Sequence, residues 1–120
     1  MLKKDLDLDR KWVKLRERLH KVLGKKPADL NGVLFLIGVQ ELGRGHDNFS
    51  KEEKQDLIHL GICKCLSLAG FYELDGVDAD GWPHWNLKKK LPHFDSLEQE
   101  KLLKMQVIEY FSKEVGIIKQ

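Results

Sequence analysis

Long apolar runs are missing from this sequence of 120 residues. The longest, VLFLIGV at residues 33–39, is far shorter than the roughly 20 residues that a membrane-spanning helix requires. The N-terminal segment is charged and does not have the pattern of a signal peptide. We therefore expect a cytoplasmic protein without a membrane span.

Cysteine is scarce as well, since the chain has only Cys63 and Cys65. Two positions apart on a helix, their side chains point about 200° apart and cannot form a disulfide with each other. Cross-links are not needed at this length, because such a domain buries about two-thirds of the surface that its unfolded chain exposes. We expect reduced thiols and a single domain over residues 1–120.

The sequence also lacks a complete metal-binding motif. Its most unusual segment, DGVDADGWPHW at residues 75–85, is rich in aspartate and glycine. A calcium-binding EF-hand loop needs oxygen ligands at positions 1, 3, 5 and 12 and glycine at position 6. Aligning Asp78, Asp80 and Gly81 to positions 3, 5 and 6 leaves Gly76 at position 1 and Leu87 at position 12, which do not fit. We expect neither a metal nor a cofactor.

Charge is distributed unevenly along the chain. Residues 1–26 hold ten lysines and arginines against four acids, a net charge of +6. Because the whole chain has a formal net charge of +2, the remainder carries −4. Five cations follow one face of the first expected helix, and they could contact nucleic acid or another anionic surface, or keep that face solvated. They are Lys11, Lys14, Arg18, Lys21 and Lys25.

The helical period of apolar residues predicts four helices. The first should run from Asp9 as N-cap to Leu23, with Gly24 after it, and should bury Leu8, Trp12, Leu15, Leu19, Val22 and Leu23. The second should begin near Pro27 and end before Gly43. Since it is apolar on nearly every side, we expect it to be central, with close helix contacts that explain Gly32 and Gly38.

The third expected helix begins at a capping box formed by Ser50 and Glu53 and stops at Gly70. Two strands, Phe71–Leu74 and Trp82–Leu87, should follow as a β-hairpin around the Asp/Gly-rich segment. Alternation places Tyr72 and Leu74 on one face of the first strand, and Trp85 and Leu87 on one face of the second. The fourth helix opens at Ser96, stops at Gly116 and carries Leu97, Leu102, Leu103, Met105, Ile108, Phe111 and Val115.

These elements predict a mainly α fold: a four-helix bundle-like domain with a two-stranded β-hairpin between helices three and four. The order resembles that of winged-helix proteins, with LSLAGFYELDGVDADGWPHWNL similar to a recognition helix that leads into a wing. That resemblance implies a third helix that enters the DNA major groove. Here its N-terminal end, SKEEKQD, is acidic, as is the hairpin tip, so DNA would be repelled from this surface.

Three motifs, VLFLIGVQELG, FSKEEKQDL and DGWPHW, also resemble those of an uncharacterised family of short bacterial proteins. The resemblance extends from about residue 30 to residue 115. It implies no activity, cofactor or site.

Two further groups of residues could carry chemistry. Asp56, His59, Cys63 and Ser67 share one face of the third helix, so His59 and Cys63 could bind zinc or form a thiolate–imidazole pair. The alternative is a buried structural cysteine beside a hydrogen-bonded histidine. Glu41 could be an acid or base with a raised pKa, but we favour a helix end that reaches solvent.

The functional hypothesis is a non-enzymatic interaction or regulatory module that binds a protein partner through the aromatic hairpin, with Tyr72, Trp82, His84 and Trp85 as contact residues. The tryptophans could instead complete the core. Nucleic-acid binding through the basic helix is the first alternative function, and a small metal-dependent or thiol enzyme is the second. The sequence does not decide whether the protein is an enzyme, and it does not indicate an oligomeric state.

Overall fold

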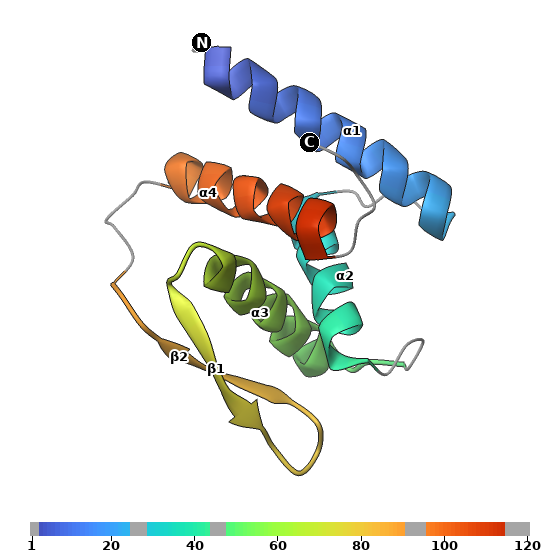
Figure 1. Ribbon diagram of the computed structural model, residues 1–120. Coiled ribbons are helices and arrows are strands. Elements are labelled where there is room, and N and C mark those ends of the chain that lie inside the picture. Colours follow the sequence, from blue (N-terminus) through green and yellow to red (C-terminus); the bar gives the residue numbers. More distant parts are fainter. Residues whose placement is uncertain (1–2, 25–28, 44–47, 91–95, 115–120) are drawn as a thin grey trace. The chain divides into compact units, whose positions relative to one another are not determined.

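The computed structural model describes residues 3–24, 29–43, 48–90 and 96–114 (Figure 1). The protein is mainly α, with an antiparallel hairpin between the third and fourth helices, which confirms the predicted class and order. The elements are α1 Lys3–Leu23, α2 Leu30–Leu42, α3 Lys51–Leu68, β1 Tyr72–Val77, β2 Pro83–Leu87, α4 Ser96–Glu109 and the π-helical turn η1 Tyr110–Glu114.

The chain divides into two compact units. The first combines residues 1–28 with 93–120, and thus contains α1, α4 and η1. The second comprises residues 29–92, and contains α2, α3 and the hairpin.

In the first unit, α1 begins six residues before the predicted start, at Lys3 rather than at Asp9. The prediction that Asp9 caps this helix was wrong, because no glycine or proline interrupts the preceding residues and the helix continues through them. Trp12 is buried as predicted, and the Lys104 ammonium lies 5.3 Å from the centre of its ring. Leu15 and Leu19 are also buried, but Val22 is 62% exposed, contrary to the prediction.

Helix α4 begins at Ser96, as predicted. Leu97 and Met105 were predicted to face the core, but they are 59% and 52% exposed. The buried side chains are clustered near the C-terminal end of α4, where the helix changes to the wider π-helical turn. They are Val107, Ile108, Tyr110 and Phe111. The predicted core residue Val115 and the stop at Gly116 lie outside the described residues.

In the second unit, α2 begins at Leu30 and not near Pro27, which lies outside the described residues. Asp29 is the N-cap, and its carboxylate accepts a hydrogen bond from the Gly32 amide at 2.9 Å. Gly32 therefore lies in the first turn of the helix. The predicted end is correct, since Gly43 follows α2 with a φ of 77° in the left-handed region.

Two glycines let α2 and α3 approach closely. A Cβ atom at Gly38 would overlap the Leu57 carbonyl group, and a Cβ atom at Gly61 would overlap the Leu34 carbonyl group. The two contacts are reciprocal, since each helix supplies one glycine and one backbone carbonyl. The close contact expected for Gly38 is confirmed, and Leu34 and Leu57 are fully buried beside it.

Helix α3 has the predicted capping box. The Glu53 amide donates to Ser50 Oγ at 3.1 Å, and the Ser50 amide donates to Glu53 Oε1 at 3.0 Å. At the other end, Gly70 has a φ of 84°, and residues 69–71 alone connect α3 to β1. Such a short connection holds the hairpin against α3.

The hairpin confirms the predicted alternation, but β1 spans Tyr72–Val77 rather than Phe71–Leu74, and β2 begins at Pro83 rather than at Trp82. Tyr72 lies opposite Leu87 and Leu74 lies opposite Trp85, so all four side chains are on one face. A bulge between Leu74 and Gly76 shifts the register toward the tip. Pro83 is the first residue of β2, where its missing N–H is tolerated.

Candidate functional site

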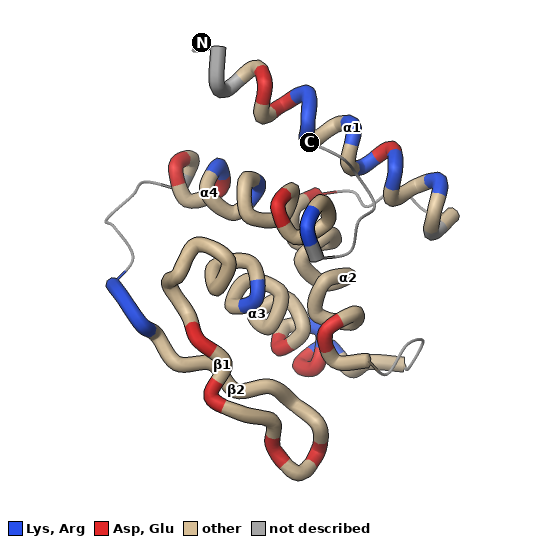
Figure 2. The backbone as a smooth tube through the Cα atoms, viewed as in Figure 1, with Lys and Arg blue, Asp and Glu red and all other residues tan. Residues whose placement is uncertain are grey.

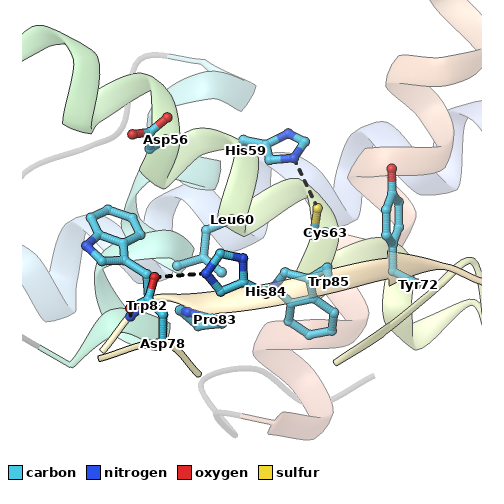
Figure 3. A pocket seen from close by; sticks show the side chains of 10 residues that line it. All are labelled: Asp56, His59, Leu60, Cys63, Tyr72, Asp78, Trp82, Pro83, His84 and Trp85. Carbon is cyan, nitrogen blue, oxygen red and sulfur yellow. Dashed lines mark hydrogen bonds and ion pairs between the residues drawn. The ribbon is translucent and has the colours of Figure 1, made fainter. Parts of the chain in front are cut away.

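A cavity of about 440 Å³ lies between α3 and the hairpin, within the second unit (Figure 3). Its volume is within the range of small-molecule and side-chain binding pockets, which is roughly 300–1,000 Å³. The described residues that line it are Asp56, His59, Leu60, Cys63, Tyr72, Asp78, Trp82, Pro83, His84 and Trp85.

The cavity joins two groups of residues that the sequence analysis treated as separate. Asp56, His59 and Cys63 lie at helical steps along one face of α3, and this face is turned toward the hairpin. All four predicted contact residues of the hairpin line the same cavity: Tyr72, Trp82, His84 and Trp85. The short connection between α3 and β1 was the available signal, since it keeps the start of the hairpin next to the end of α3.

The two tryptophans are neither core residues nor fully exposed. Trp82 and Trp85 are both half-buried, and each contributes part of its ring to the cavity wall. Within the described part of the chain, the Trp85 indole nitrogen is buried and has no hydrogen-bond partner. A buried N–H without an acceptor is costly, by about 1–3 kcal/mol.

Asp78 organises the turn beside the cavity. Its Oδ1 accepts hydrogen bonds from the Asp80 amide at 2.9 Å and from the Trp82 amide at 3.0 Å. Its Oδ2 lies 2.8 Å from His84 Nε2. The hydrogen bond with His84, followed by that with the Trp82 amide, lowers the pKa of Asp78. Asp78 is therefore a carboxylate at neutral pH, and it positions both Trp82 and His84.

His59 and Cys63 do interact, with 3.5 Å between Nε2 and Sγ, which is compatible with both interpretations. Burial raises the pKa of the Cys63 thiol from 9.0 to about 11. The thiol is therefore protonated at neutral pH and lies within hydrogen-bond distance of the His59 ring. This arrangement fits the structural cysteine and does not suit a nucleophilic thiolate.

Ser67, the fourth residue predicted on the face of α3 that carries Asp56, His59 and Cys63, is not among the residues that line the cavity. Its hydroxyl donates to the Lys64 carbonyl oxygen one turn earlier on α3. Such local bonds are usual for serine within a helix. Three of the four residues on this face of α3 therefore line the cavity.

Glu41 lies near the end of α2, where its carboxylate is partly exposed and 3.8 Å from the Lys64 ammonium. This placement agrees with the favoured interpretation of a helix end that reaches solvent. A partly exposed, ion-paired carboxylate is a poor candidate for an acid or base that depends on burial.

The row of cations predicted on one face of the first helix is also exposed where the structure describes it. Lys11, Lys14, Arg18 and Lys21 are exposed on α1, and Lys25 lies outside the described residues. Figure 2 shows lysines and arginines along α1, whereas the charged residues at the hairpin tip are acids. The two candidate surfaces therefore have opposite charge.

Metal-binding side chains do not converge in the described residues: no three of His, Cys, Asp or Glu are placed together as ligands. Nor does any helix in the described segments have the length and apolarity needed to cross a membrane. Comparison of the chain with family models, curated proteins and solved structures finds no match.

Proposed function

We propose that the protein is an interaction module, and that a protein partner binds to the aromatic hairpin and the cavity beneath it. The observation that supports this most strongly is the cavity itself, in which Tyr72, Trp82 and Trp85 are half-buried against α3. Aromatic side chains next to a pocket are typical anchors of protein interfaces, because a partner can desolvate them fully.

The apolar surface continues from the cavity along the hairpin. Leu74 is 50% exposed, Val77 is 61% exposed and Leu87 is 57% exposed. Leu74 and Leu87 share a hairpin face with Tyr72 and Trp85, so the cavity and the exposed leucines form a continuous surface. Acidic residues border this surface and give it the polar rim that binding sites commonly have. They are Asp75, Asp78 and Asp80 near the hairpin tip.

Site-specific photo-cross-linking tests this function. A photoreactive benzoyl-phenylalanine at Leu74 should capture a discrete protein from a lysate of the source organism. The same residue at Met105 is the matched control, because Met105 is 52% exposed and Leu74 is 50% exposed, but Met105 lies on α4 in the other unit. We expect a cross-linked product from position 74 that is missing from position 105.

The absence of any specific product at position 74 would contradict the proposal, as would the same product at both positions. Both variants should retain the circular dichroism and thermal transition of the unmodified protein, because each substitution is at an exposed position.

Nucleic-acid binding remains the second candidate. The observation that favours it is the exposed stripe on α1, where Lys11, Lys14, Arg18 and Lys21 repeat at three- and four-residue steps. Such a row could neutralise successive phosphates of a nucleic acid. The acidic hairpin would not take part, so this candidate depends on α1 alone.

A further inference from the structure

The charge of the cavity restricts what can bind in it. Its ten described lining residues include two carboxylates, Asp56 and Asp78, and no lysine or arginine. Two histidines, His59 and His84, also line it, so none of the described lining residues carries a permanent positive charge. The two carboxylates are therefore its principal charges.

The walls of the cavity are aromatic. Trp82, Trp85 and Tyr72 line it, and the face of an aromatic ring attracts cations through its quadrupole. Carboxylates beside aromatic rings form a binding environment for an ammonium or guanidinium group, because both components favour positive charge. In Figure 3, Trp82 lies next to the Asp78 turn on the side of the cavity where Asp56 projects from α3.

On the basis of the proposed function, we infer that the cavity recognises a cationic side chain, arginine or lysine, in a segment of the protein partner. The volume of about 440 Å³ is sufficient for one such side chain and adjoining backbone.

The lysines that follow β2 do not compete for this position in the structure. The Lys88 ammonium pairs with Glu73 at 3.0 Å, and the Lys89 ammonium lies 4.6 Å from the centre of the Phe71 ring. Neither residue lines the cavity. These two lysines therefore do not occupy the cavity.

The test uses two capped tripeptides, acetyl-Gly-Arg-Gly-amide and its citrulline counterpart, in which a neutral urea group replaces the guanidinium group. The chain has three tryptophans, so the titration can be followed through three indole N–H signals in a proton–nitrogen NMR spectrum. We expect the arginine peptide to shift the signals of Trp82 and Trp85 in a saturable manner. The signal of Trp12, buried on α1, serves as an internal control.

The citrulline peptide should bind about tenfold more weakly, because it loses both the cation–π and the ionic attraction. Asp56→Asn should weaken arginine binding about fivefold, the value for loss of one ion pair near a surface. Asp75→Asn is the matched control: Asp75 is an exposed hairpin carboxylate outside the cavity, and its substitution should leave the affinity unchanged.

Equal affinities for the two peptides would overturn the inference, as would an arginine titration in which the Trp82 and Trp85 signals do not shift. If Leu74 still cross-links to a partner in that case, the interaction function stands and only the preference for a cation fails. If the arginine peptide binds but Leu74 captures no protein, the cavity binds cations and the partner function fails.

Discussion

The thiols of Cys63 and Cys65 are the most perturbed titrating groups that the structure describes. Burial raises the pKa of Cys63 from 9.0 to about 11. Burial, with a smaller contribution from the negative charge of Glu41, raises the pKa of Cys65 from 9.0 to about 12. Both cysteines are free and both side chains are buried. They therefore belong to the packing of α3 and remain protonated at neutral pH.

These shifts make the free energy of unfolding depend on pH in the alkaline range. A pKa that is higher in the folded state means that the protonated thiols stabilise the fold fully below about pH 9, the unfolded value. That stabilisation is lost as the pH rises toward 11 for Cys63 and 12 for Cys65. We expect the free energy of unfolding, measured with urea, to fall over this window. In Cys63→Ala the free energy of unfolding should fall less than in the unmodified protein. An equal fall would show that the Cys63 thiol does not cause this pH dependence.

Residue-level predictions from the sequence succeeded where a local pattern decides the outcome. Ser50 and Glu53 form the capping box because both hydrogen bonds lie within one helical turn. The sequence could not show that His59 and Trp82 line one cavity, because this depends on how the hairpin folds onto α3. It could not show either that the Trp85 indole nitrogen is buried without a partner in the described part of the chain.

At the scale of elements, the crossing of α2 and α3 depends on Gly38 and Gly61. Gly38→Ala should destabilise the protein by about 2–3 kcal/mol, because the added methyl group meets the Leu57 backbone, which cannot rotate away as a side chain can. Chemical unfolding measures this loss. Gly61→Ala should have a similar effect through the Leu34 backbone.

The control for this substitution is Asn31→Ala, since Asn31 is exposed on the same helix. A surface substitution of this kind should change the free energy of unfolding by less than about 0.5 kcal/mol. If Gly38→Ala had the same free energy of unfolding as the unmodified protein, α2 and α3 would not cross at this contact.

The types and order of the elements were predictable, because helical periodicity and hairpin alternation are properties of the sequence itself. The start of α1 was not, since Asp9 has the chemistry of an N-cap but lies inside a longer helix. The exposure of Leu97 and Met105 was not predictable either. A helix with apolar residues on several sides does not indicate which of them a neighbour will cover.

At the scale of the whole molecule, charge separates the two candidate surfaces. Residues 1–26 have a net charge of +6, and the hairpin tip holds Asp75, Asp78 and Asp80. Phosphates should be attracted to the first surface and cations to the second. The single-domain prediction for residues 1–120 stays a prediction, while the structure divides the chain into two compact units.

The second candidate function makes a distinct prediction about salt. If the exposed cations of α1 bind phosphates, about four contacts should give a slope near −4 when the logarithm of the binding constant for duplex DNA is plotted against that of the salt concentration. Lys14→Glu together with Arg18→Glu should abolish this binding, whereas Lys54→Glu, an exposed position on α3, should have a small effect. Failure to bind a duplex at low salt would exclude this function.

The central claim is that the aromatic cavity between α3 and the hairpin is the binding site for a partner. The most direct measurement is the yield of the Leu74 cross-link in a Trp82→Ala background, with the hairpin fold verified by its NMR spectrum. Trp82 lies just before β2 and lines the cavity without entering a strand pair. We predict that the cross-link to the partner is lost, and an undiminished yield from the folded variant would contradict the account.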